Sequence, residues 1–268
     1  MKILVFTDLH YYGGDNPQFN TSRKLVKYAL PMLDELMKIA ESENVDFVVN
    51  LGDIIQDTYD KQKDIECLGF MFEKLKGFSC PCYSVLGNHD MKMMDSEKEV
   101  EAIMGYESNY SFDKEAFHFV ILTTDVSPEL GIDRGGIYKT QTLPEKMLAW
   151  LEEDLDKNTL PCIIFTHFVL CEVESVPDPC MFLKNRAEVK AIFEKHKNIK
   201  AVFNGHQHTP KIREEKGLTY YVVGSPTASP EENGVPIGEY AFVETYGSEI
   251  TVSKRNIVLS EKGSNNVS

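Results

Sequence analysis

Short apolar runs alternate with longer amphipathic segments along most of the chain. The apolar runs are typical of buried strands and lie at Lys2–Thr7, Asp46–Leu51, Cys82–Leu86, Cys162–Thr166 and Lys200–Asn204. The amphipathic segments have apolar residues at helical spacing and lie at Arg23–Glu41, Asp64–Leu75, Ser96–Met104, Pro144–Lys157 and Arg186–Lys197. Within the first of these helices, Pro31 predicts a kink. The alternation predicts a mostly parallel sheet with helices on both faces.

Two regions have the shorter spacing of antiparallel hairpins. Ser108–Asp113 and Phe117–Asp125 form one predicted hairpin. In the last third of the chain, tight glycine turns separate predicted strands at Lys211–Glu215, Thr219–Val223, Tyr240–Thr245 and Glu249–Arg255. These later hairpins predict a second sheet packed beside the first, in an α/β layered sandwich. The chain has no linker-like segment, so we expect one domain over residues 1–258 and a polar, frayed tail over 259–268.

Composition limits the classes of partner. The chain has 268 residues, with 28 lysines and arginines against 42 aspartates and glutamates, for a net charge of −14. This balance argues against a general basic surface for nucleic acid or anionic lipid. No apolar run approaches the ~18 residues of a membrane span, and the N-terminus lacks a signal-peptide pattern. The cysteines form no Cys-x-x-Cys pair and fit reduced thiols, so we expect a cytoplasmic protein.

Polar residues gather where the predicted strands end. The strands run directly into Asp8-Leu9-His10, Gly52-Asp53, Gly87-Asn88-His89-Asp90, His167 and Gly205-His206-Gln207-His208. Ligands of open α/β sheets bind just outside the carboxyl ends of the strands, so we expect these ends to meet in one crevice. Five of the seven histidines lie at those ends, which indicates a shared role.

The residue types in this crevice favour a metal site. Asp8 and His10, like His206 and His208, are two residues apart, a spacing that places both side chains on one face of an extended backbone. Mixed carboxylate and imidazole ligands suit manganese, iron, zinc, cobalt or nickel better than magnesium or calcium. The absence of cysteine from the group argues against a structural zinc site.

The ordered set of motifs resembles that of the calcineurin-like metallophosphoesterases. The five motifs follow one another in the family's order and with comparable intervals, from Asp8 to His208. The resemblance implies a four-layer αββα sandwich of two mixed sheets flanked by helices. It also implies a site for two divalent or trivalent metal ions, with manganese, iron and zinc as the expected metals.

The same resemblance assigns roles to individual residues. The first metal would be held by Asp8, His10, Asp53 and His208. The second would be held by Asp53, Asn88, His167 and His206, with the Asp53 carboxylate bridging the pair. His89 matches the family's catalytic histidine, which lies near the metals without binding them. A metal-bridging hydroxide would attack phosphorus while His89 assists the leaving group.

One position departs from the family pattern. In protein phosphatases and many phosphodiesterases of the family, an aspartate three residues after the bridging aspartate orients the catalytic histidine. Here that position is Gln56, followed by Asp57, and the sequence leaves open which of the two orients His89. Gln56 also argues against a purple acid phosphatase, which has a tyrosine ligand there. Asp57 stands where protein phosphatases have a phosphate-binding arginine, which argues against that class.

The expected substrate is a small phosphorylated molecule. Length and layout look most like those of small bacterial phosphodiesterases that act on cyclic nucleotides or nucleotide diphosphate derivatives. This resemblance implies hydrolysis of a phosphodiester or a nucleotide-derived pyrophosphate. The alternatives are a DNA nuclease on the same core and a non-enzymatic scaffold of the same fold. Acidity counts against the nuclease, and the complete motif set counts against the scaffold. We expect neither nucleic acid nor membrane as a partner, and the sequence leaves open the physiological substrate and whether the chain forms a homodimer.

Residues around the crevice give weaker signals. We expect Asp90 to cap or orient rather than react, and His118 and His196 to be structural. The loop Asp133-Arg134-Gly135-Gly136 is either a turn or a phosphate contact. The segment Val173–Cys180 is either an inert loop or a wall of the pocket.

Overall fold

The computed structural model describes residues 1–13, 20–21, 24–124, 132–133, 137–138, 142–172, 183–231 and 234–259. The segment Val173–Cys180 and residues 134–136 of the predicted phosphate loop lie outside this range. The predicted tail over 259–268 also lies outside it, except for Leu259.

The first of two central sheets is mixed and has the strand order β15-β14-β1-β4-β5. Its strands are β1 (Lys2–Phe6), β4 (Phe47–Asn50), β5 (Cys82–Ser84), β14 (Glu239–Tyr246) and β15 (Glu249–Asn256). β1, β4 and β5 are parallel, and β14 pairs antiparallel with β1 and with β15. The carboxyl ends of the three parallel strands therefore point to one edge of the sheet.

The second sheet has the order β12-β13-β11-β10-β7-β6. Its strands are β6 (Tyr110–Lys114), β7 (Phe117–Leu122), β10 (Cys162–Thr166), β11 (Ile199–Asn204), β12 (Lys211–Glu215) and β13 (Leu218–Val222). The four inner strands are parallel, and the outer strands β6 and β12 are antiparallel to their neighbours. Two small two-stranded pairs are formed by β2 (Asn20–Thr21) with β3 (Lys24–Leu25) and by β8 (Ile132–Asp133) with β9 (Ile137–Tyr138).

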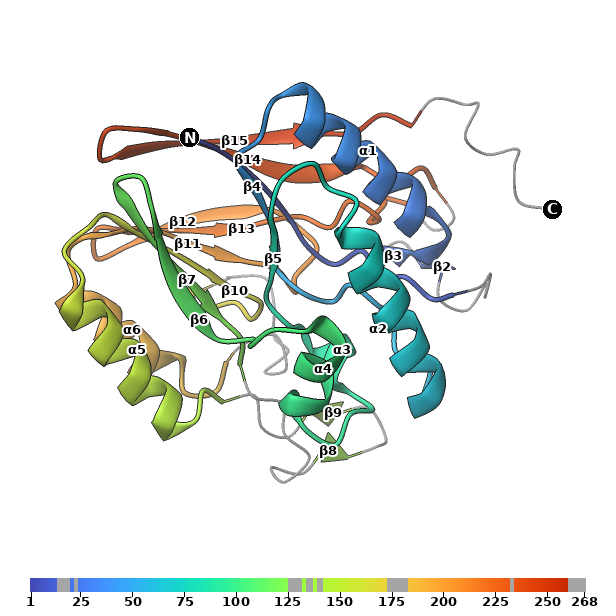
Figure 1. Cartoon of the computed structure of the whole chain (residues 1–268), viewed down its shortest axis with the longest axis horizontal. Coiled ribbons are helices and arrows are strands. Elements are labelled where there is room, and N and C mark those ends of the chain that lie inside the picture. The colour runs from blue at the N-terminus through green and yellow to red at the C-terminus, as the bar shows by residue number, and fades with distance from the viewer. Residues whose placement is uncertain are drawn as a thin grey trace.

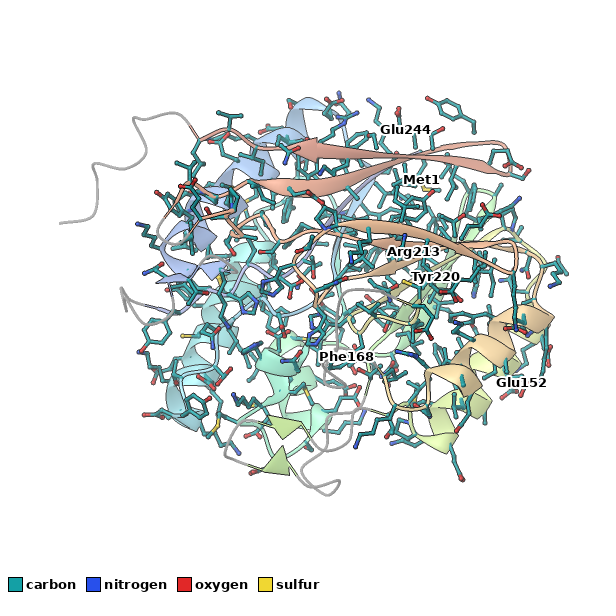
Figure 2. The ribbon with its side chains drawn as sticks, turned by 180° about the vertical axis from the view of Figure 1, so that it is seen from behind. Met1, Glu152, Phe168, Arg213, Tyr220 and Glu244 are labelled. Atoms are coloured by element: carbon teal, nitrogen blue, oxygen red, sulfur yellow. The ribbon has the colours of Figure 1, made fainter. Side chains whose placement is uncertain are left out.

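Helices cover the outer faces of both sheets (Figure 1). The helical segments are η2 (Val26–Tyr28, a 3₁₀ turn), α1 (Ala29–Ser42), α2 (Lys61–Leu75), α3 (Asn88–Met91), α4 (Glu97–Met104), α5 (Glu145–Lys157) and α6 (Arg186–Lys195). α1 and α2 lie on the first sheet, and α5 and α6 lie on the second. Seen from behind, Glu152 of α5 lies near the outer edge of the molecule (Figure 2). None of the helices in the described part of the chain combines the length and apolar character of a membrane span.

Three apolar layers hold this arrangement together. Along β1, Leu4 and Phe6 pack with α1 and α2, whereas Ile3 and Val5 pack between the two sheets. The strand is buried on both faces, which explains its continuous apolar sequence. The layer between the sheets is rich in aromatic rings, such as the edge-to-face pair of Phe47 and Phe119 at 5.0 Å. The structure thus has the four layers of the predicted αββα sandwich, and the predicted fold class is confirmed.

Two local predictions were wrong. The late hairpins do not form a second sheet of their own, because β14–β15 joins the first sheet and β12–β13 joins the second. The helix predicted from Arg23 begins at Ala29. Pro31 therefore lies in its first turn, where a backbone N–H has no partner within the helix and a proline requires no kink.

Candidate metal centre

The strand ends of both sheets converge on one buried group of polar side chains. Asp8 and His10 follow β1, Asp53 follows β4, and Asn88 and His89 lie in α3 directly after β5. His167 follows β10 of the second sheet, and His206 and His208 follow β11. All seven predicted metal ligands are buried. The structure therefore brings the predicted residues together from segments far apart in the sequence.

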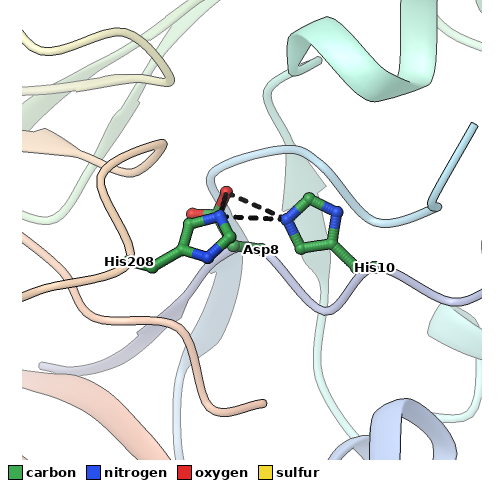
Figure 3. Close-up of side chains that lie close together, drawn as sticks. All are labelled: Asp8, His10 and His208. Carbon is green, nitrogen blue, oxygen red and sulfur yellow. Dashed lines mark hydrogen bonds and ion pairs between the residues drawn. The ribbon is translucent and has the colours of Figure 1, made fainter. Parts of the chain in front are cut away.

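Asp8, His10 and His208 form the first group of ligand atoms (Figure 3). The Nε2 atoms of His10 and His208 are 3.0 Å apart. Asp8 Oδ1 lies 3.1 Å from His208 Nε2 and 3.6 Å from His10 Nε2. Atoms that each bind one metal ion at about 2.1 Å lie roughly 3.0–3.4 Å from one another. The separations of 3.0 and 3.1 Å fit a shared cation, and that of 3.6 Å is slightly longer.

A second group contains Asp53, Asn88, His167 and His206. His167 Nε2 lies 3.1 Å from His206 Nδ1, 3.2 Å from Asn88 Oδ1 and 3.4 Å from Asp53 Oδ2. Asp53 Oδ2 also lies 4.0 Å from His10 Nε2 in the first group. The Asp53 carboxylate thus stands between the two groups.

The hydrogen bonds of Asp8 leave one oxygen suited to a cation. Its Oδ2 accepts hydrogen bonds from Thr7 Oγ1 at 2.6 Å and from the backbone N–H of His206 at 2.9 Å. Its Oδ1 is buried without a well-aligned donor among the described residues and faces the two imidazoles. A buried carboxylate oxygen in this state is costly unless a positive charge compensates it. These residues therefore fit a metal ion.

The second group is oriented by backbone contacts. His167 Nδ1 lies 2.8 Å from the carbonyl oxygen of Leu51, which accepts the Nδ1 proton and turns Nε2 toward the site. The backbone N–H of His89 donates to Asp53 Oδ1 at 2.7 Å, so Oδ2 is the oxygen that faces the histidines. Both contacts direct ligand atoms inward.

Backbone strain is concentrated in this centre. Nine non-glycine residues in the described part of the chain have positive φ, and five of them are predicted ligands: Asp8, His10, Asp53, His206 and His208. The left-handed conformation costs an L-residue roughly 1–2 kcal/mol and persists where the surroundings over-determine it, often at functional sites. The pairs Asp8/His10 and His206/His208 therefore lie in left-handed turns. The expectation of an extended backbone at these pairs was wrong.

Two glycines allow the loops to approach closely. A Cβ on Gly205 would lie 2.1 Å from Thr7 Oγ1, and a Cβ on Gly87 would lie 2.2 Å from Asp53 Oδ1. No side chain fits at such distances. These positions keep the ligand loops of different strands in contact.

His89 has a different environment from the seven predicted ligands. Its side chain is 18% exposed, and its Nε2 lies 3.9 Å from Asp53 Oδ2. Its Nδ1 contacts Asp57 Oδ1, whereas Gln56 Nε2 lies farther away, at 3.4 Å from Nδ1, and itself donates to Asp57 Oδ1 at 3.2 Å. Asp57 is therefore the residue that orients His89. His10, Asp53 and His89 are also close enough to form a third potential metal group.

The family model of the calcineurin-like phosphoesterases matches residues 1–210. The chain belongs to the calcineurin-like phosphoesterase family. The match includes every motif from Asp8 to His208 and confirms the family and the class of enzyme predicted from the sequence, a hydrolase of phosphoester bonds.

Two curated relatives of this phosphoesterase have the same description. A "Probable cyclic nucleotide phosphodiesterase" of Xenorhabdus bovienii (strain SS-2004) is 25% identical over 235 residues, which cover 85% of this chain and 86% of the relative. A second "Probable cyclic nucleotide phosphodiesterase", of Fibrobacter succinogenes (strain ATCC 19169 / S85), is 23% identical over 194 residues, covering 71% and 68%.

Solved structures with the same fold include two phosphatases. A dimetal phosphatase from Danio rerio superposes with a TM-score of 0.74 at 18% identity, covering 96% of both chains. A purple acid phosphatase from yellow lupin (Lupinus luteus) seeds has a TM-score of 0.63 at 15% identity, covering 96% of this chain and 51% of that one. At these identities the likeness shows the fold alone.

The charges of the phosphoesterase's centre strongly perturb its titratable groups. Burial raises the pKa of Asp8, but the nearby imidazoles outweigh burial and hold it well below its usual range. Burial lowers the pKa of His167, but Asp53, Asp8 and the Leu51 carbonyl outweigh burial and raise it to about 9. Burial, with the adjacent charge of His167, lowers the pKa of His206 to about 3. A metal ion entering this centre must therefore displace a proton from His167.

Several supporting residues of the phosphoesterase gave no signal in the sequence. Ser225 Oγ and Thr227 Oγ1 donate to the backbone carbonyl of Asp8, at 2.8 and 3.3 Å. Phe168, which is buried and is labelled in Figure 2, packs its ring against His206 with 4.7 Å between centroids. Such contacts arise only when distant segments fold together. Asp90, by contrast, has the expected orienting position, because it accepts hydrogen bonds from the backbone.

Proposed function

We propose that this phosphoesterase uses two metal ions to hydrolyse a phosphodiester, or a nucleotide-derived pyrophosphate, in a small molecule. The observation that carries the proposal is the position of Asp53, whose Oδ2 faces His167 at 3.4 Å and His10 at 4.0 Å. The description of both curated relatives as cyclic nucleotide phosphodiesterases supports a nucleotide substrate.

The proposed metal ligands divide along the two groups. Asp8, His10, Asp53 and His208 hold one ion; Asn88, His167, His206 and Asp53 hold the other. When bound, such a pair of ions supplies an activated water at neutral pH and neutralises phosphoryl oxygens. The protein contributes a buried, preorganised set of ligand atoms whose hydrogen bonds already point them inward.

We propose that His89 assists departure of the leaving group. Asp57 holds its Nδ1, so its Nε2 is free to face the reacting atoms beside Asp53. A proton at Nε2 would be donated to the leaving oxygen as the phosphorus–oxygen bond breaks. Its partial exposure, in contrast to the buried ligands, suits a group that contacts the substrate.

Several predictions from the sequence stay predictions. They are the limits of a single domain at residues 1–258, manganese, iron or zinc as the metals, a cytoplasmic location and the absence of nucleic acid and membrane partners. A homodimer stays an open alternative.

The test combines metal analysis with turnover of a bis-aryl phosphate, an aryl monophosphate and a cyclic nucleotide. Asp53→Ala should lose both metal and activity. His89→Ala should keep its metal and lose most turnover on substrates with poor leaving groups. His196→Ala, which changes a histidine outside the centre, is the control. Full activity in both Asp53→Ala and His89→Ala would refute the proposal.

A parallel assay addresses the nuclease alternative. We expect a rate on the small ester that does not depend on salt, and no cleavage of DNA. Efficient, salt-sensitive DNA cleavage would favour the nuclease instead, because contacts to phosphates make binding strongly dependent on salt.

A further inference from the structure

Lys92 shares the Asp57 carboxylate with His89, the proposed catalytic residue. It follows α3 directly, three residues after His89. Its Nζ lies 3.0 Å from Asp57 Oδ2, and its side chain is only 8% exposed. Asp57 is fully buried. The pair is therefore an internal ion pair rather than a surface one.

A second residue holds the lysine in this position. Lys92 Nζ donates to the Tyr59 hydroxyl at 3.1 Å and lies 4.3 Å from the centre of the Tyr59 ring. Tyr59 has a φ of 62°, a left-handed conformation that is unfavourable for tyrosine. The loop between β4 and α2 thus contributes both contacts to the ammonium group.

The two oxygens of Asp57 have separate partners. Oδ1 contacts His89 Nδ1 and accepts a hydrogen bond from Gln56 Nε2 at 3.2 Å, whereas Oδ2 forms an ion pair with Lys92. The terminal torsion of an aspartate is broad, so a carboxylate held at one oxygen alone is poorly fixed in rotation. The ion pair at the second oxygen restricts that rotation and so favours one plane of the carboxylate for the His89 ring to meet.

We propose that Lys92 is a positioning residue for the reaction, which acts through Asp57 to orient His89. The inference rests on the proposed function of His89 as the group that assists the leaving group. In this proposal Lys92 acts on the reaction through Asp57 and His89. Its loss should therefore slow only the step in which His89 takes part.

The kinetic test is a double-mutant cycle on a diester with a poor leaving group. Lys92→Met should lower kcat at least 10-fold, with little change in KM or metal content, and Lys92→Arg should restore part of the rate. On a diester with a good leaving group the loss should be small. In a His89→Ala background, Lys92→Met should have no further effect. Lys61→Met, which removes ion pairs with Asp95 and Glu99 on the surface, is the matched control.

A second readout does not depend on turnover. In protein labelled with ¹⁵N-histidine, the hydrogen-bonded Nδ1–H proton of His89 is identified by its loss in His89→Ala. Lys92→Met should shift or broaden this signal, and Lys61→Met should not. If Lys92→Met folds poorly, Lys92→Gln is used for both measurements.

Three results would overturn the inference: an unchanged rate, an equal loss of rate in the wild-type and His89→Ala backgrounds, or an unchanged Nδ1–H signal. Failure of the proposed function is distinct, because the wild-type protein would then hydrolyse none of the phosphodiesters. In that case the Nδ1–H signal still decides whether Lys92 orients His89.

Discussion

Asp90 and Asp53 lie 37 positions apart in the sequence, yet the Asp90 carboxylate accepts a hydrogen bond from the backbone N–H of Asp53 at 2.8 Å. The same carboxylate accepts from the N–H groups of Ile54, Ile55 and Gly87, at 2.9, 3.2 and 2.9 Å. It joins the loop after β4 to the loop after β5, and both loops carry proposed metal ligands.

Replacing Asp90 by alanine should therefore lower both stability and metal content. The change leaves four backbone N–H groups without this acceptor. Each unsatisfied buried N–H costs about 1–3 kcal/mol if the structure does not relax. We therefore expect the free energy of unfolding to fall by at least about 3 kcal/mol. Denaturant unfolding and metal analysis measure the two effects. Asp34→Ala, at an exposed position of α1, is the control. A loss below about 1 kcal/mol would contradict the proposed role of Asp90.

Gly205→Ala should disrupt the centre, whereas Gly69→Ala should not. The new methyl group at 205 would lie 2.1 Å from Thr7 Oγ1 and 3.0 Å from Asp8 Oδ2, so the Asp8 carboxylate must move. At Gly69, within α2, a Cβ meets no atom within 4 Å, and alanine should raise stability by up to about 1 kcal/mol. Melting temperature and bound metal are compared in the two variants. Equal metal content in both variants would show that metal binding does not depend on the close approach of Gly205 to Thr7 and Asp8.

His118 should make stability depend on pH. Its Nδ1 lies 2.7 Å from Asp113 Oδ1 and its Nε2 lies 2.9 Å from Asp154 Oδ2. Burial lowers the pKa of His118, but these two carboxylates outweigh burial and raise it above 6.5 in the folded state. The protonated ring therefore stabilises the fold fully below pH 6.5, and this contribution is lost as the pH rises through the folded-state pKa.

The measurement compares the wild type with His118→Gln in thermal denaturation between pH 5.5 and pH 8.5. The difference in melting temperature should be largest at the acidic end and shrink as pH rises. Effects of pH on the metal centre are common to both proteins and cancel in the difference. A difference that is constant across this range would contradict the assignment.

Removing the metals should lower the melting temperature. Without a cation, the buried carboxylates of Asp8 and Asp53 are left with the nearby imidazoles as compensating groups, which stabilise them less than two metal ions would. A ligand present at about 1,000 times its Kd stabilises the folded state by roughly 4 kcal/mol, which corresponds to about 10 °C in a protein of this size. We expect a chelator to cause a drop of this order and manganese or zinc to reverse it. Asp53→Ala should show little response to the chelator, and a similar response in both proteins would argue against this site.

The sequence predicted the layered fold and the meeting of the strand ends because both follow from local patterns. Buried parallel strands such as β4 are continuous apolar runs, and their carboxyl ends must share one edge. The spread of the late hairpins over two sheets was not predictable in this way. Strand pairing such as that of Phe242 with Leu4 depends on packing between distant segments, and the apolar run of β14 would fit either sheet.

The same limit applies inside the site. The motifs identified Asp53 and His167, but nothing in the local pattern indicated that Asp57 rather than Gln56 faces His89. Lys92 was missed because a lysine two residues beyond a motif is ordinary in sequence, and only the fold brings it to a buried carboxylate. Residues that act through other residues therefore require the structure.

The two sheets contribute ligands to one centre, Asp8 and Asp53 from the first and His167 and His208 from the second. A bound ion would thus cross-link two sheets that also pack on each other through side chains such as Phe47 and Phe119. A small shift of one sheet against the other would separate the proposed ligand atoms without any change to the ligand residues. The affinity for the cation should therefore depend on how the aromatic layer between the sheets is packed. A metal titration would then detect repacking of that layer even when all the ligand residues are unchanged.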